Sequence, residues 1–178
     1  LADAVLWRPL PFPQPDRLVA LWERTGPAET AAPARITGAR YLDWKARATV
    51  FEDLAAFGAA GFQLQHDREI STVRGVRVTG NFFDVLGVTP ALGRLIAAGD
   101  QKAGAPPVVV LSHAFWTTHF GASPSVVGQS LRLSGTPYTI IGVLPDLWLP
   151  SWPVNPATIE LDAALRQVWV PMPDASVL

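Results

Sequence analysis

The segment "SLRLSGTPYTIIGVLP", residues 130–145, constrains the fold more than any other part of the sequence. Leu131 and Leu133 alternate with polar residues, which is typical of a strand with one buried face. Ser134-Gly135 supplies residues suited to a tight two-residue turn, and an apolar run returns at 138–144. The sequence therefore predicts a β-hairpin, so this region should join an antiparallel sheet.

A second segment, "VVVLSHAFWTTHFG" at 108–121, predicts a strand that runs into a helix. Ser112 beside His113 could be read as a hydrolase nucleophile with its base. A nucleophile elbow needs glycine two residues before and after the serine, where this chain has Val110 and Ala114. Adjacent residues also do not face each other on a helix. The sequence instead favours Ser112 as a helix N-cap, with Gly121 ending the helix.

Composition narrows the class of protein. The chain has 178 residues, of which 49% are hydrophobic and 16% charged, so it can bury a core and is not disordered. Its net charge is −1 and its basic residues are scattered, which argues against a nucleic-acid binder. It has no cysteine, which excludes disulfides, thiolate metal sites and cysteine nucleophiles. No run of about 20 apolar residues predicts a membrane span.

The remaining patterns mix strands with short helices. Alternation predicts strands at 17–24, 62–65, 70–78 and 168–170. Helical spacing over 41–57, with a capping-box pattern "TVFE" at 49–52, predicts two short helices that break near Ala48. Asn81 should cap another short helix that ends at Gly87, and a helical patch should span 159–166. Without strict βαβ alternation, the fold class expected is α+β.

Candidate catalytic and metal-binding residues are few. His113 and His119 are six residues apart, about 120° around a helix, and His66 falls on a predicted turn, so no metal site is expected. Asp43, Glu52 and Asp53 form the densest carboxylate group. Capping and solvent exposure explain these carboxylates better than acid/base catalysis does. The "GAAG" at 58–61 lacks the lysine of a phosphate loop, so we predict no cofactor and no enzyme activity.

The sequence contains seven tryptophans, and two of them, Trp148 and Trp152, lie in a proline-rich segment. If exposed, their rings would form a partner interface or a sugar-binding surface. The alternative is a loop folded over the core with both rings packed against it. A secreted, aromatic-rich ligand- or carbohydrate-binding domain is therefore the alternative function that the residues leave open.

Several motifs resemble one family in the correct order. They are "VTGNFFDVLGVTPALGR" (78–94), "VVVLSHAFWTTHFG", "SPSVVGQ" (123–129) and "LRLSGTPYTIIGVLP" (131–145). Together they look like the periplasmic core domain of MacB-type ABC transporter permeases, within the wider group that includes FtsX. The segments "AVLWRPLPFPQPDRLVALWE" (4–23) and "YLDWKARATVFEDLAAF" (41–57) are similar to a subfamily of duplicated orphan permeases.

The resemblance implies an architecture. A porter-like, ferredoxin-like α/β subdomain at 15–87 and 147–178 would be interrupted by a small inserted α/β subdomain at 88–146. Residues 1–14 would be a connector from a transmembrane helix. The final porter strand and helix of the family would be missing after "VWVPM" (168–172), which would leave an unpaired sheet edge.

The resemblance also implies a mechanical function. The domain would be the periplasmic part of an inner-membrane efflux or export permease. It would transmit ATP-driven movement of its own transmembrane helices and would contact substrate or partner proteins. The implied partners are a cytoplasmic ATPase subunit, a second permease domain in a homodimer or pseudo-dimer, and a periplasmic adaptor.

Overall fold

The structure is a computed structural model of the whole chain, and it describes residues 12–21, 23–25, 32–34, 36–66, 69–146, 153–154, 159–160 and 166–172. The fold is α+β, as expected: a mixed sheet with few helices. Trp148 and Trp152, most of the predicted connector at 1–14 and residues 161–165 of the predicted helical patch lie outside the described residues. The helical prediction is wrong at Ile159–Glu160, which is a strand that pairs with Pro153–Val154.

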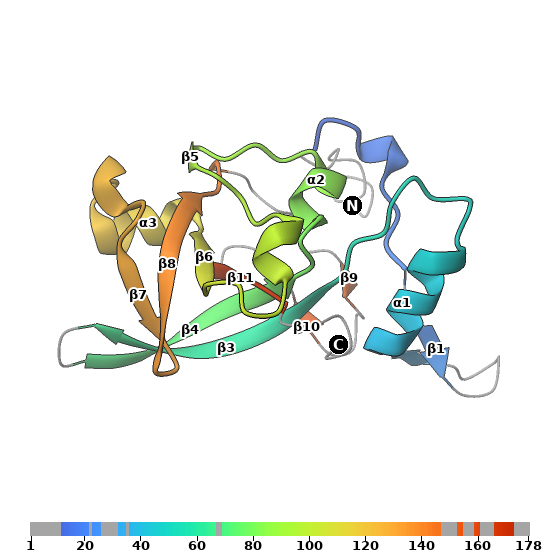
Figure 1. Cartoon of the computed structure of the whole chain (residues 1–178), viewed down its shortest axis with the longest axis horizontal. Coiled ribbons are helices and arrows are strands. Elements are labelled where there is room, and N and C mark those ends of the chain that lie inside the picture. The colour runs from blue at the N-terminus through green and yellow to red at the C-terminus, as the bar shows by residue number, and fades with distance from the viewer. Residues whose placement is uncertain are drawn as a thin grey trace, which may run out of the picture.

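The main sheet closes on itself. Its order is β5-β8-β6-β11-β4-β3-β7, and β7 also pairs with β8, so all of these strands except β5 form a ring (Figure 1). The strands are β3 (Phe57–His66), β4 (Glu69–Val78), β5 (Leu92–Gly93), β6 (Val108–Leu111), β7 (Ser130–Leu133), β8 (Thr136–Val143) and β11 (Val168–Pro171). Two small antiparallel sheets pair β1 (Glu23–Thr25) with β2 (Ala32–Ala34), and β9 (Pro153–Val154) with β10 (Ile159–Glu160).

Short helices lie around this sheet. The α-helices are α1 (Gly38–Arg47), α2 (Phe82–Leu86) and α3 (His113–Phe120), and the 3-10 turns are η1 (Pro15–Arg17), η2 (Ala98–Gln101) and η3 (Pro124–Val126). In Figure 1, α3 lies beside β6, β7 and β8, while α1 lies at the opposite end of the molecule.

The core consists of two clusters on the two faces of the sheet. All of β6 is buried: Val109 and Leu111 join the cluster that contains Phe115 of α3. Val108 and Val110 join the other cluster, which contains Phe82, Phe83 and Leu86 of α2. This alternation explains why the β6 sequence is apolar throughout, because a strand covered on both faces needs no polar positions.

The two clearest sequence predictions are confirmed. β7 and β8 form the expected hairpin, and Ser134 (φ 48°) and Gly135 (φ 83°) both adopt the positive φ of its tight turn. The Ser112 hydroxyl accepts a hydrogen bond from the Phe115 amide at 3.0 Å, which caps α3. Gly121 ends α3 in the left-handed conformation, as Gly87 ends α2.

Three other local predictions are wrong. Residues 17–24 do not form one strand: Pro15 starts the turn η1, residues 18–21 are irregular, and only Glu23–Thr25 is a strand. No second helix follows Ala48: residues 49–56 are irregular, and Glu52 pairs with Arg17 and completes no capping box. Asn81 precedes α2 without a side-chain cap, because its amide donates to Asp53 and to the Leu54 carbonyl instead.

The sheet includes strands from both predicted subdomains. β6 and β8, from residues 88–146, lie next to each other, and β6 pairs with β11 at Val168 and Trp169. β7 pairs with β3 at Leu64 and Gln65. The division into a porter-like part and an inserted part therefore stays a prediction, and any such parts share one continuous sheet.

Candidate functional site

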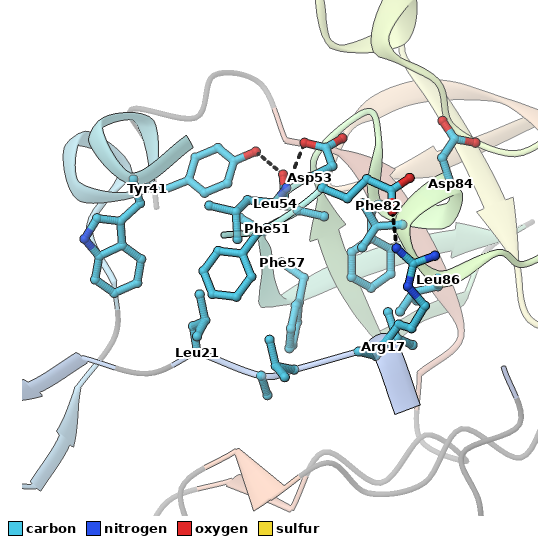
Figure 2. A pocket seen from close by; sticks show the side chains of 18 of the residues that line it. Arg17, Leu21, Tyr41, Phe51, Asp53, Leu54, Phe57, Phe82, Asp84 and Leu86 are labelled. Atoms are coloured by element: carbon cyan, nitrogen blue, oxygen red, sulfur yellow. Dashed lines mark hydrogen bonds and ion pairs between the residues drawn. The ribbon is translucent and has the colours of Figure 1, made fainter. Parts of the chain in front are cut away.

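An apolar groove lies beside α1. It has a volume of about 970 Å³ and is lined by the segment 13–21, by α1, by the loop 50–56, by the start of β3 and by α2. Figure 2 shows Leu21, Phe51 and Phe57 converging on this space from three different segments. We call this surface the α1 groove.

α1 is placed by hydrogen bonds at its start and along its length. The Thr37 hydroxyl accepts from the Arg40 amide at 3.3 Å, which begins the helix. The Tyr41 hydroxyl donates to the Leu54 carbonyl at 3.1 Å, and Lys45 donates to the same carbonyl at 3.2 Å. The buried Tyr41 thus ties α1 to the loop 50–56, which forms the neighbouring wall of the groove.

Ion pairs lie along the rim of the α1 groove. Arg17 contacts Glu52 at 2.6 Å, and Lys45 contacts Asp53 at 3.1 Å. Both pairs are exposed, so each stabilises the fold little by itself. The Arg17–Glu52 pair nevertheless joins the segment 13–21 to the loop 50–56 across the groove (Figure 2).

Asp53 holds this rim together through several bonds. Its carboxylate accepts from the Asn81 amide at 2.7 Å and from the Leu54 backbone amide at 2.7 Å. Partial burial by itself raises the pKa of the Asp53 carboxyl, but the bonds from Asn81, Leu54 and Lys45 outweigh burial, so the pKa is lowered. Asp53 is therefore a stable anion that orders the rim and is poorly suited to act as a proton donor.

The candidate catalytic residues of the sequence are not brought together. Asp43 pairs with Arg47 within α1, and Glu52 and Asp53 have the partners described above. Ser112 is a cap, as expected. The His113 ring packs edge-on against Trp116, and the His119 ring stacks on Phe115 at 4.1 Å. Within the described ranges, no group of three His, Cys, Asp or Glu residues could hold a metal.

The α1 groove was not predicted from the sequence. Its lining comes from segments far apart in the chain, and it places exposed apolar side chains at its edge, with Val19 64% and Val50 83% exposed. Such exposure of large apolar residues around a concave surface is typical of a binding site. The local signal that could have pointed to it is the set of aromatic residues Trp44, Phe51 and Phe57, all of which line the groove.

Comparison with known proteins identifies the family. The model of the MacB-like periplasmic core domain matches residues 9–177. The chain belongs to this family. Among curated proteins, none matches the sequence of this chain.

Solved structures with TM-scores above 0.5 share the fold. The periplasmic region of MacB from Actinobacillus actinomycetemcomitans is 16% identical, with a TM-score of 0.58 over 79% of this chain and 57% of that chain. A domain assigned to a permease protein of Porphyromonas gingivalis is 19% identical, with a TM-score of 0.51 over 79% of this chain and 55% of that chain. The extracellular domain of the ABC-type transporter YknZ from Gram-positive bacteria is 19% identical, with a TM-score of 0.49 over 66% and 52%.

The MacB-like periplasmic core domain described here spans little more than half of each of these chains. No helix among its described residues is long and apolar enough to cross a bilayer. At these identities the likeness shows the fold alone.

Proposed function

We propose that this chain is the extracytoplasmic domain of an ABC-type export permease and that its role is mechanical rather than catalytic. The family match over residues 9–177 carries this proposal. A cytoplasmic ATPase subunit would move the transmembrane helices of the parent protein. The domain would pass that movement to a substrate or partner protein outside the membrane.

The structure supports a specific route for this movement. Phe12, which is 7% exposed, packs into the cluster formed by α2, β4 and β6. The residues that follow it, including Arg17 and Leu21, line the α1 groove. A pull on the chain before Phe12 would therefore act first on Phe12 and on α2, whose Phe82 and Leu86 also line the groove, and it would reach the groove through α2.

The α1 groove is the surface we propose for partner or substrate contact. Its apolar lining suits a hydrophobic ligand or an apolar face of a protein. Candidate partners are an adaptor protein, a second permease domain and the transported substrate. Trp148 and Trp152, which the sequence suggests as a partner interface, stay a prediction.

The location of the domain can be tested with cysteine labelling, because the chain contains no cysteine. Val50→Cys in the full parent protein introduces a thiol at a side chain that is 83% exposed. In a parent protein whose other cysteines, if any, are replaced by serine, a membrane-impermeant maleimide added to intact spheroplasts should label this variant and not the cysteine-free parent. Labelling only after the membrane is permeabilised would contradict an extracytoplasmic domain.

The permease assignment can be tested in the flanking coding sequence. We expect an apolar span of about 20 residues before Leu1 and further spans beyond Leu178. A cleavable signal peptide with no later span would contradict the permease and favour a secreted binding domain.

A further inference from the structure

Strand β3 has an open edge. On one side it pairs with β4 along its whole length, from Phe57 to His66. On the other side it pairs with β7 only through Leu64 and Gln65. Among the described residues, no strand pairs with the part of this edge before Gln63 (Figure 1).

The hydrogen bonds show which backbone groups point to this edge. The Gln63 carbonyl accepts from the Ser134 amide at 2.7 Å, and the Gln63 amide donates to the Ser134 hydroxyl at 3.1 Å, so Gln63 faces away from β4. Ala56 faces the opposite way, toward Thr79 at the end of β4. Because backbone groups alternate along a strand, Ala59 and Gly61 direct their N–H and C=O groups to the open edge.

This edge lacks the usual protection against pairing. Natural edge strands are protected by charged side chains, proline or bulges. The sequence of 57–65, "FGAAGFQLQ", contains no charged residue and no proline, and β3 pairs with β4 without a bulge. Ala59 and Gly61 are both exposed, and no described atom lies within 4 Å of a Cβ built on Gly58 or Gly61. Another backbone can therefore approach β3 closely here.

We propose that the open edge of β3 pairs with the same edge of a second copy of this chain. The two strands would run antiparallel about a two-fold axis at Ala60. Ala59 of each copy would then exchange both of its backbone hydrogen bonds with Gly61 of the other. The bonds of Gln63 limit the choice of register. A pairing centred on Gly61 would place Gln63 opposite Ala59 of the other copy, but the N–H and C=O of Gln63 are already bonded to Ser134.

A second copy fits this edge better than an unrelated strand does. In a two-fold pair each side chain faces itself or a near neighbour, so any charge on the strand would repel its own copy. Here only alanine and glycine meet around the axis, with no charge to repel. The contact is short and therefore weak in dilute solution. Anchoring of two permease domains in one membrane, as the proposed function implies, would raise the effective concentration of one β3 edge near the other.

Disulfide trapping tests the register. In the proposed pair the two Ala60 residues form a non-hydrogen-bonded pair, about 4.5 Å apart between Cα atoms, which is within disulfide range. The Ala60→Cys chain should form a disulfide-linked dimer under mild oxidation, because it has no other cysteine. The control is Thr72→Cys on β4, which is exposed and lies opposite Gln63, three residues along the strand from the axis. It would lie about 25 Å from its copy, because about 14 Å across three strand spacings combines with an offset of about 20 Å along the strands. Equal cross-linking of both variants would overturn the register.

A proline substitution tests the edge itself. Ala59→Pro removes one N–H that points to the open edge and no hydrogen bond among the described residues, while Ala59→Val keeps that N–H. By light scattering, the unsubstituted and A59V chains should dimerise with rising concentration, and A59P should stay monomeric with an unchanged circular dichroism spectrum.

Two results would overturn the proposal. One is an A59P chain that dimerises like the unsubstituted chain. The other is an unsubstituted chain that stays monomeric even at about 1 mM, the order of effective concentration that tethering gives, whether or not A59P is destabilised. Neither result would affect the proposed location outside the membrane, which the maleimide experiment tests separately.

Discussion

Arg94 and Asp100 form the most complete ion pair of the described residues. Two nitrogens of the guanidinium donate to the two carboxylate oxygens at 2.7 and 2.8 Å, and the Ala97 amide donates to the same carboxylate at 2.9 Å. The Asp100 side chain is only 12% exposed. The hydrogen bond from Arg94 is the largest influence on the Asp100 carboxyl and, despite partial burial, its pKa is lowered. The pair therefore holds the loop after β5 against η2.

We predict that Asp100→Asn lowers the free energy of unfolding by about 1–2 kcal/mol at pH 7. Because the folded-state pKa is depressed, the stabilisation is present above the unfolded-state pKa of about 4 and is lost as the pH falls through the folded-state value. Urea unfolding between pH 7 and pH 2 should show the difference from the unsubstituted chain shrinking below about pH 4. A constant difference across this range would contradict the ion pair. Asp146→Asn, at an exposed position, is the control.

Ser112 is predicted to act on stability and not on chemistry. Ser112→Ala should cost about 1 kcal/mol of unfolding free energy, because it removes the acceptor of the Phe115 amide, while Ser112→Asp should keep most of the stability. Urea unfolding of the two variants measures this. The unsubstituted chain should not react with a fluorophosphonate probe. Labelling that is lost in S112A would revive the hydrolase interpretation.

At the scale of elements, local patterns predicted those structures whose partners lie nearby in the chain. The β7–β8 hairpin and the cap of α3 need only residues within a few positions of each other. The capping-box pattern at 49–52 does not form, and Glu52 instead bonds Arg17, 35 residues away, a partner that no local pattern shows. Likewise, the expected strand at 17–24 is largely replaced by a segment that packs along the α1 groove, since Leu18 and Leu21 line it. The alternation of apolar and polar residues at 17–24 shows that one side of the segment is apolar. It does not show whether a sheet or another surface covers that side.

The contact between β5 and β8 depends on Gly142. A Cβ built there would lie 2.8 Å from the Leu92 carbonyl oxygen and still closer to the Arg94 carbonyl oxygen. Both contacts are with backbone, so the strands would have to separate. We predict that Gly142→Ala lowers the unfolding free energy by about 1–3 kcal/mol. Gly58→Ala, in open space on β3, should change it by less than about 0.5 kcal/mol in the same urea titration. Equal losses would mean that close approach at Gly142 is not the cause.

At the scale of the whole molecule, the sequence indicated an α+β fold but neither the ring nor the α1 groove. The ring depends on β11 joining β6 to β4 and on β7 reaching β3, pairings between residues about 60 or more positions apart. The groove depends on where the segment 13–21 lies against α1 and α2. Neither arrangement leaves a periodic pattern in the chain, because each results from packing between elements and not from the elements themselves.

The shared sheet leads to a prediction about cooperativity. Leu111→Ala removes a fully buried side chain from β6, within the predicted inserted part, and Leu86→Ala removes a buried one from α2, within the predicted porter-like part. Each should cost about 2–5 kcal/mol. Because β11 pairs with strands of both parts, the chain should unfold in one step, so either substitution should speed native-state hydrogen exchange equally in β4 and β6. If L111A accelerated exchange in β6 alone, residues 88–146 would be an independent folding unit, and pairing through β11 would not couple the two parts.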